Sequence, residues 1–259
     1  MKYFRSSSLW TLPSENIHSF QVIQAESVEE ALGKDVDCID LDFLDYQYIV
    51  EKYPSHLLEM HHLGFADCYL KIRRQGGDQL KDRLSDHRYQ LALTYKDVFL
   101  KELSGNHSSL QTNYLAVLVG DERTVANFFP ALSQLGYANF KFVVKDPQTM
   151  LPYLQSVLSK YIGLNADLLS FADLAEIKES ASALIVDVDH QQEKELIQGL
   201  TYFNFLVTQA LFLDVRAVIS SDLEEEAERA EMTVIKSQQL HTKRFEHIEK
   251  LLQAQHEGR

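Results

Sequence analysis

The 259-residue sequence predicts an α/β protein with two domains, and three observations lead to this prediction. Apolar runs typical of strands alternate with amphipathic segments typical of helices, as in a parallel sheet covered by helices on both faces. Apolar residues make up 45% of the chain, which is enough to bury the cores of two domains. A small, polar and unpatterned stretch, residues 104–113, divides the chain in the manner of a linker.

The first domain, residues 1–103, begins with short α/β elements. Residues 20–24 alternate apolar and polar side chains and predict a strand. Residues 27–33 predict a helical turn with Ser27 as the N-cap. Residues 36–43 alternate apolar residues with aspartates, which predicts a half-buried strand with one solvent-facing side. A metal site built from those aspartates is the alternative interpretation.

Three longer segments complete the first domain. Residues 45–63 have helical spacing that is broken near Pro54. Residues 65–72 predict a strand, and residues 78–103 predict a helix-rich segment.

The second domain, residues 114–236, opens with the most regular stretch of the sequence. An apolar run at 115–119 ends in Gly120, an amphipathic segment covers 124–135, and a second apolar run covers 140–144. A strand, a tight turn, a helix and a second strand form the βαβ unit that opens a Rossmann-type domain. The turn contains only Gly120, however, whereas a phosphate-binding turn has the spacing G-x-G-x-x-G.

The same alternation continues to the end of the chain. Predicted strands cover 167–171, 183–188, 210–215 and 233–235, and predicted helices cover 147–161, 193–200 and 222–230, the last with Asp222 as its N-cap. Residues 237–259 predict a C-terminal amphipathic helix. That helix is expected either to cover the domain or to bind a partner.

Composition and charge exclude several classes of function. The net charge of −13 repels phosphate backbones, so no binding to nucleic acid is expected. Cys38 and Cys68 are the only cysteines, too few for a disulfide framework. The sequence contains no signal-peptide pattern and no apolar run of membrane-spanning length. A cytoplasmic protein without membrane contact is therefore expected.

Taken in this order, the chain resembles the shikimate dehydrogenase family. The resemblance rests on the Gly120 turn, on Leu213-Asp214-Val215, and on the segments 62–75, 93–103 and 222–235. It implies a substrate-binding first domain, a Rossmann domain for NADP, and a C-terminal helix that returns to the substrate side. It also implies an oxidoreductase that transfers hydride between NADP and a shikimate-like hydroxy acid.

The catalytic positions that the resemblance implies have changed. The catalytic lysine of the family falls at Gln75, with Arg73 and Arg74 beside it, and the catalytic aspartate falls at Tyr95. A glutamine amide does not titrate in the useful range and cannot exchange the substrate proton. Tyrosine would need a strongly lowered pKa, because its reference value is about 10.

The cofactor and ligand positions have changed as well. The resemblance places Gly120, Arg123 and Thr124 at the cofactor-binding turn. It places Lys145 at the position that binds the 2′-phosphate of NADP. Glu122, Arg123 and Val125 replace the later glycines, so Cβ atoms and negative charge hinder the approach of a pyrophosphate. The ligand-binding glutamine of the family falls at Lys243 or Arg244, which join Arg73 and Arg74 as candidate cleft residues.

These changes together predict a pseudoenzyme without hydride transfer, with no cofactor and no metal, that binds a protein or a small metabolite. A homodimer is compatible with this prediction. The alternative is an active NAD(P)-dependent oxidoreductase on a shikimate-like hydroxy acid, in which Tyr95, Lys71 or an arginine handles the proton. A third hypothesis places a divalent cation at Asp187, Asp189 and His190, which follow a predicted buried strand. A polar loop cap is the other interpretation of these three residues.

Overall fold

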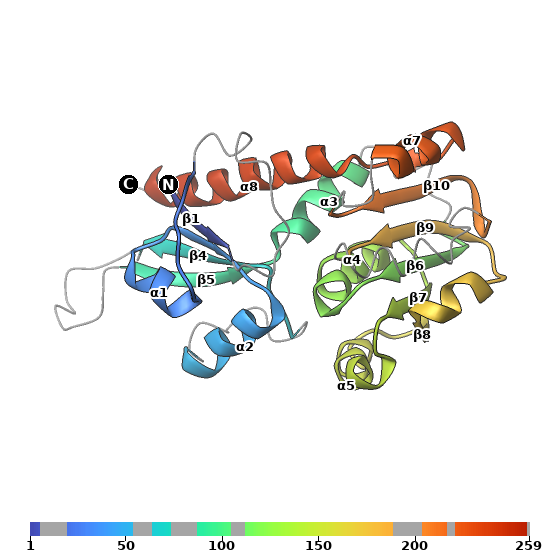
Figure 1. Cartoon of the computed structure of the whole chain (residues 1–259), viewed down its shortest axis with the longest axis horizontal. Helices are drawn as coiled ribbons and strands as arrows, with labels where there is room; N and C mark the ends of the chain where they lie inside the picture. Colours follow the sequence, from blue (N-terminus) through green and yellow to red (C-terminus); the bar gives the residue numbers. More distant parts are fainter. Residues whose placement is uncertain are drawn as a thin grey trace. The chain divides into compact units, whose positions relative to one another are not determined.

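The computed structural model describes residues 1–5, 20–53, 64–73, 87–104, 112–188, 204–216 and 221–257 (Figure 1). The chain divides into two compact units, unit 1 with Met1–Thr94 and Thr242–Arg259, and unit 2 with Tyr95–His241. The division falls inside two helices, α3 (Thr94–Ser104) and α8 (Ser237–Glu257). The C-terminal helix therefore contributes residues to both units.

Unit 1 is built on a five-stranded mixed sheet with the order β2-β1-β3-β4-β5. Its strands are β1 (Lys2–Arg5), β2 (Gln21–Val22), β3 (Cys38–Asp40), β4 (Cys68–Arg73) and β5 (His87–Ala92). β1 pairs in parallel with β2 and β3, whereas β4 pairs antiparallel with β3 and β5. The aromatic rings of Tyr3, Phe20 and Phe245 pack edge to face, so the C-terminal part of α8 covers one face of this sheet.

The two short helices of unit 1 begin at side-chain caps. The Ser27 hydroxyl accepts a hydrogen bond from the Glu30 N–H at the start of α1 (Val28–Gly33), which confirms the predicted N-cap. The Asp42 carboxylate accepts from the Asp45 N–H at the start of α2 (Phe43–Lys52). Each cap satisfies a backbone donor that the first turn of a helix leaves without a partner.

Two predictions for unit 1 are wrong. β3 has no solvent-facing side, because Cys38, Ile39 and Asp40 are all buried and Asp40 is only 2% exposed. The alternation of the sequence could not show that Asp40 has a buried arginine as its partner. The segment 78–103 is not simply helix-rich either, because β5 forms within it. Antiparallel pairing with β4 and stacking of Tyr89 on Tyr69, 4.8 Å between ring centroids, stabilise this strand.

Unit 2 is built on a six-stranded sheet, parallel throughout, with the order β11-β10-β9-β6-β7-β8. Its strands are β6 (Leu115–Val119), β7 (Asn139–Val144), β8 (Asn165–Ser170), β9 (Ala181–Val186), β10 (Leu206–Asp214) and β11 (Thr233–Val234). Besides its parts of α3 and α8, its other elements are α4 (Glu122–Gln134), α5 (Pro147–Leu158), the 3₁₀ helix η4 (Phe171–Glu176) and α7 (Ser221–Arg229). This arrangement confirms the predicted α/β class with a Rossmann-like sheet.

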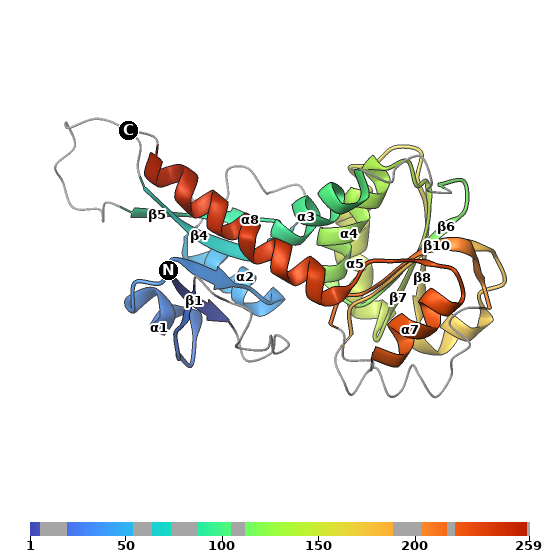
Figure 2. The same cartoon turned by 90° about the horizontal axis from the view of Figure 1, so that it is seen from above.

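Both faces of the parallel sheet are covered, with α4 and α5 on one side and η4 and α7 on the other (Figure 2). On the first side the Phe129 ring packs on Phe140 and Phe142 of β7, at 4.8 and 5.5 Å between centroids. On the second side Leu174 and Ala227 join a core of branched side chains from the strands. Burial on both faces explains why the strands are apolar throughout rather than alternating.

The element boundaries of unit 2 differ from the prediction in a few places. α4 begins at Glu122, two residues earlier than predicted, because Asp121 caps it. Asp222 lies inside α7 and is not its N-cap, so that prediction is wrong. The predicted helix 193–200 and most of the stretch 104–113 lie outside the described residues. Within the described part of the chain, no helix is both long and apolar enough to cross a membrane.

Candidate functional site

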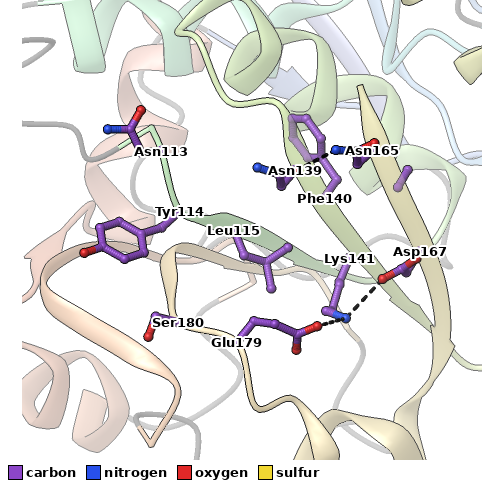
Figure 3. A pocket seen from close by; sticks show the side chains of 11 residues that line it. Asn113, Tyr114, Leu115, Asn139, Phe140, Lys141, Asn165, Asp167, Glu179 and Ser180 are labelled. Atoms are coloured by element: carbon purple, nitrogen blue, oxygen red, sulfur yellow. Dashed lines mark hydrogen bonds and ion pairs between the residues drawn. The ribbon is translucent and has the colours of Figure 1, made fainter. Parts of the chain in front are cut away.

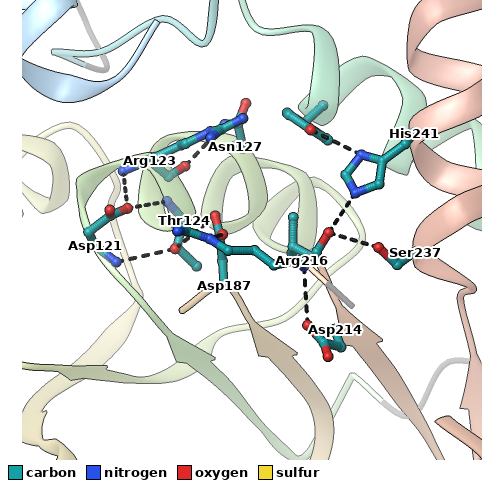
Figure 4. A network of polar contacts seen from close by, with 11 residues as sticks. Asp121, Arg123, Thr124, Asn127, Asp187, Asp214, Arg216, Ser237 and His241 are labelled. Carbon is teal, nitrogen blue, oxygen red and sulfur yellow. Dashed lines mark hydrogen bonds and ion pairs between the residues drawn. The ribbon is translucent and has the colours of Figure 1, made fainter. Parts of the chain in front are cut away.

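The site lies at the carboxyl end of β6, where the order of successive strands in the parallel sheet reverses. β6 pairs with β7 on one side and with β9 on the other. Ligands of open parallel sheets bind at the carboxyl ends of the strands next to such a switch point. The Gly120 N–H donates to the Val143 carbonyl at 3.0 Å, and the Asp187 N–H donates to the Val119 carbonyl at 2.8 Å. These bonds hold the ends of the three strands together. Figure 4 shows the polar side chains that gather at this end of the sheet.

Gly120 is required by the close approach of two neighbours. A Cβ atom at this position would lie 2.0 Å from the Thr124 hydroxyl oxygen and 2.8 Å from the Asp187 carbonyl oxygen. In a G-x-G-x-x-G turn, the first glycine makes the tight turn and the second lets the backbone approach the pyrophosphate. Gly120 keeps the first role, with the Thr124 side chain packed against it, whereas Glu122 stands at the second position.

The N-terminus of α4 is capped by the protein itself. The Asp121 carboxylate accepts hydrogen bonds from the N–H groups of Arg123 at 2.9 Å and Thr124 at 3.4 Å. In return, the Asp121 N–H donates to the Thr124 hydroxyl at 3.2 Å. These helix N–H groups are the donors that hold a phosphate in a dinucleotide-binding turn. An internal carboxylate therefore takes the place of that anion, and the turn does not fit a pyrophosphate.

A second carboxylate, Asp187, lies beside the first. Its Oδ1 accepts from Arg216 Nε at 2.6 Å, and its Oδ2 accepts from the Thr124 hydroxyl at 3.4 Å. The side chains of Asp187 and Arg216 are only 1% and 9% exposed. Burial by itself would raise the pKa of Asp187, but the charges of Arg216 and Arg123 outweigh it and lower this pKa. Asp187 is therefore ionised at neutral pH.

Asp121 responds in the opposite direction. The residue is exposed as a whole, yet desolvation of its carboxyl group and the nearby charge of Asp187 raise the pKa of Asp121 to about 6. At pH 7 most molecules therefore carry two negative charges at this turn. The charges of Arg216 and Arg123 balance them, so the carboxylates are retained within the protein's own ion pairs and hydrogen bonds.

Tyr95 belongs to a buried polar cluster at the edge of this site. The guanidinium carbon of Arg123 lies 5.1 Å from the centroid of the Tyr95 ring, and the Arg123 residue is 3% exposed. The Tyr95 hydroxyl lies 3.0 Å from His241 Nδ1, and His241 Nε2 lies 2.6 Å from the Val215 carbonyl oxygen. A carbonyl oxygen only accepts, so Nε2 carries a proton, and in the neutral imidazole Nδ1 accepts from the Tyr95 hydroxyl.

The sequence prediction missed three members of this site, Asp121 as a cap, Arg216 and His241. The D-x-x-T spacing before an amphipathic segment could have identified Asp121 as half of a capping box. Nothing in the sequence marks Arg216 or His241, because their partners lie far away in the chain.

The predicted cleft residue Arg244 lies in unit 1 and is fully buried. Its guanidinium group forms a two-pronged ion pair with the Asp40 carboxylate, and its Nε donates to the Thr94 hydroxyl at 2.7 Å. The Tyr3 hydroxyl donates to the same carboxylate. Lys243 is partly exposed, and Lys71, a candidate for proton handling, pairs with Asp35 at 2.6 Å.

The remaining predicted residues are spread over the chain. Lys145 is exposed after β7, and Asp146 beside it caps α5 by accepting from the Gln148 N–H at 3.0 Å. Arg73 ends β4, and nothing further of its side chain is described. Gln75, Arg74, Asp189 and His190 lie outside the described residues. The described residues include no group of three or more His, Cys, Asp or Glu side chains placed to hold a metal ion.

No family model and no curated protein matches this sequence. Solved structures do match along nearly the whole chain. Quinate dehydrogenase from Corynebacterium glutamicum in complex with NAD has a TM-score of 0.64 at 10% identity, covering 96% of this chain and 92% of that one. Shikimate 5-dehydrogenase from Listeria monocytogenes, in complex with shikimate and NAD, has a TM-score of 0.63 at 10% identity, covering 98% and 91%.

A longer protein from S. pombe, with dehydroquinate dehydratase and shikimate dehydrogenase, has a TM-score of 0.61 at 11% identity. The match covers 98% of this chain and 50% of that protein. The resemblance found in the sequence is thus confirmed at the level of the fold: the chain has the two-domain fold of the shikimate dehydrogenases.

Proposed function

We propose that this chain is a non-catalytic relative of the shikimate dehydrogenases, which binds no nicotinamide dinucleotide and acts as a binding module for a protein or a small metabolite. The supporting observation is the Asp121 carboxylate on the N–H groups of Arg123 and Thr124. A dinucleotide would have to displace this carboxylate to reach the donors that normally hold its pyrophosphate.

Charge adds to this steric argument. A pyrophosphate at the turn would face both Asp121 and Asp187, and the nearby cation Arg216 is already paired with Asp187. Two like unit charges 4 Å apart repel by about 4 kcal/mol at the effective dielectric constant of a protein surface. Glu122 adds an obstacle, because its side chain stands at the position of the second glycine, where the backbone would approach the pyrophosphate. Lys145 cannot offset these costs, since it is exposed and lies next to Asp146.

The acid-base positions support the same proposal. The amide of Gln75 cannot exchange a proton with a substrate hydroxyl. The Tyr95 hydroxyl donates to His241, and both side chains are buried, at 1% and 4% exposed. A hydride-transfer reaction on a hydroxy acid needs an acid-base pair that the substrate can reach. Gln75 and the buried Tyr95 do not form such a pair.

One observation favours a second candidate, an active NAD(P)-dependent oxidoreductase with a rewired site. Tyr95 and His241 form a hydrogen-bonded pair of the kind that can pass a proton. In this candidate Tyr95 would exchange its proton with the substrate and His241 would supply or receive it. The solved structures with this fold include complexes with NAD, so the same cofactor class would be used.

Titration with the cofactors separates the two candidates. The full chain is heated with NAD or NADP at about 1 mM, and the Listeria monocytogenes enzyme serves as the positive control. A ligand at a hundred times its Kd adds about 2.7 kcal/mol of stability, which is readily measured as a rise in Tm. We expect no rise for this chain. A saturable rise overturns the proposal, and oxidation of NADPH with dehydroshikimate or dehydroquinate would then establish the second candidate.

A further inference from the structure

A pocket of about 430 Å³ opens at the opposite end of the parallel sheet of unit 2, where β6, β7 and β8 begin (Figure 3). Its volume lies in the range of small-molecule sites. It shares no lining residue with the cluster around Asp121 and Asp187. An inference about this pocket is therefore independent of the proposal on the dinucleotide site.

Strand register places four polar side chains on one face of the sheet. Asn139 of β7 lies beside Asn165 of β8, and two residues further along, Lys141 lies beside Asp167. Residues two apart on a strand point to the same face. Sheets of this class are apolar on both faces where helices cover them. These four polar side chains are therefore part of the pocket lining rather than of the apolar core.

The two asparagines form a donor and an acceptor ready for a ligand. Asn165 Nδ2 donates to Asn139 Oδ1 at 3.0 Å. This bond leaves Asn139 Nδ2 as a donor and Asn165 Oδ1 as an acceptor, and neither has another partner in the part of the chain that the structure describes. Amide groups that face a pocket in this way select a ligand that can both accept and donate.

The charged groups next to them add one donor and two acceptors. Lys141 Nζ donates to Asp167 at 3.1 Å and to Glu179 at 2.9 Å. The two carboxylates are 67% and 59% exposed, so each can accept further hydrogen bonds from a ligand. Burial by itself would lower the pKa of Lys141, but the hydrogen bonds to Glu179 and Asp167 outweigh it and raise this pKa. Lys141 therefore remains a charged donor and cannot act as a base.

The side of the pocket around Tyr114 adds apolar surface, from Tyr114 and Leu115, beside the polar residues Asn113 and Ser180. Leu115 lies between Tyr114 and Lys141 in Figure 3, and the Tyr114 residue is 42% exposed. An exposed aromatic ring beside a set of mixed donors and acceptors offers a flat surface for the apolar face of a ring-shaped ligand.

We propose that this pocket binds a neutral polyhydroxylated ring, a monosaccharide or a cyclic polyol. Each hydroxyl group of such a ligand donates and accepts, and so matches the amides of Asn139 and Asn165 together with the carboxylates of Asp167 and Glu179. The C–H face of the ring packs on Tyr114.

Other ligand classes fit less well. An anion would meet two carboxylates around a single ammonium group that they already engage. An amine would leave the Asn139 donor without an acceptor and would approach the Lys141 charge. An apolar ligand would leave Asn139 Nδ2 and Asn165 Oδ1 without hydrogen-bond partners and would shield them from water.

Saturation-transfer NMR on the full chain tests the proposal. The neutral probes are glucose, galactose, mannose and myo-inositol, and the charged probes are spermidine and citrate. We expect saturation of the ring protons of at least one neutral probe. A double variant with Asn139→Leu and Asn165→Leu should weaken that binding by about tenfold or more, the effect of losing about 1.4 kcal/mol. Asn204→Leu, an exposed asparagine outside the lining, is the matched control and should bind as the parent does.

The proposal is overturned by any of three results, namely no saturation of a neutral probe, unchanged binding in the folded double variant, or a stronger response to a charged probe. Circular dichroism and Tm establish that the double variant folds. If it does not fold, Tyr114→Ala replaces it, because Tyr114 is exposed and its ring supplies the apolar face. That variant should weaken binding severalfold, and unchanged binding would again overturn the proposal.

Discussion

The Tyr95 hydroxyl lies 3.0 Å from Nδ1 of His241, which is 146 residues later in the chain, and donates to it in the neutral imidazole. The other imidazole nitrogen of His241 is held by the Val215 carbonyl at 2.6 Å. The ring thus has both nitrogens engaged and a defined tautomer. This arrangement makes Tyr95 a donor within the core of unit 2 rather than a free acid.

Tyr95→Phe should therefore lower the free energy of unfolding by about 1–2 kcal/mol, because it leaves the buried Nδ1 of His241 without its donor. Urea denaturation followed by circular dichroism measures the change. Tyr114→Phe is the matched control, since Tyr114 is 42% exposed, and it should leave stability unchanged. Equal stability of Tyr95→Phe and the parent would contradict the hydrogen bond.

A second prediction concerns the cap on α4. Asp121→Ser and Asp121→Ala both remove the negative charge that faces Asp187, but only serine keeps an oxygen that can accept from the helix N–H groups. The serine variant should therefore be more stable than the alanine variant by about 1 kcal/mol. Asp146→Ala, which removes the similar cap on α5, provides a benchmark for the size of the effect. If serine and alanine at position 121 give the same Tm, the cap does not stabilise α4.

Local signals made the first βαβ unit predictable, whereas distant contacts concealed much of the site. β6, β7 and the intervening helix follow from short apolar runs and from Gly120, all within about thirty residues. Asp40 was misread because its environment depends on Arg244, 204 residues away, and an alternating pattern cannot show which aspartate has a partner. β5 was missed because pairing with β4 stabilises it more than its own sequence does.

The buried pair of Asp40 and Arg244 gives a third prediction. Arg244→Met should destabilise the protein by about 3–5 kcal/mol, since it leaves a buried carboxylate without its counter-charge. Adding Asp40→Leu to this variant should recover part of the loss, because both charges are then gone. Lys243→Met, a partly exposed neighbour on the same helix, should change stability by no more than about 0.5 kcal/mol. Thermal unfolding of the four proteins gives these values, and a tolerated Arg244→Met would refute the assignment of a buried ion pair.

The fourth prediction is that stability depends on pH in the acid range through the titration of Asp187. The pKa of Asp187 is lowered in the folded state by the charges of Arg216 and Arg123, which outweigh the effect of burial, and in the unfolded state it is about 3.9. A lowered folded-state pKa means that the contribution to stability is fully present above the unfolded-state value. It is lost as the pH falls from about 3.9 through the folded-state pKa.

Asp187→Asn removes this contribution together with the buried ion pair. The variant should be less stable than the parent at pH 7, and its Tm should fall less steeply between about pH 4 and pH 2. Glu176→Gln, at an exposed carboxylate of the same unit, should follow the parent curve. Measuring Tm across this pH range for the three proteins tests whether ionised Asp187 contributes to stability. Parallel curves for Asp187→Asn and the parent would mean that Arg216 does not hold Asp187 in its ionised form.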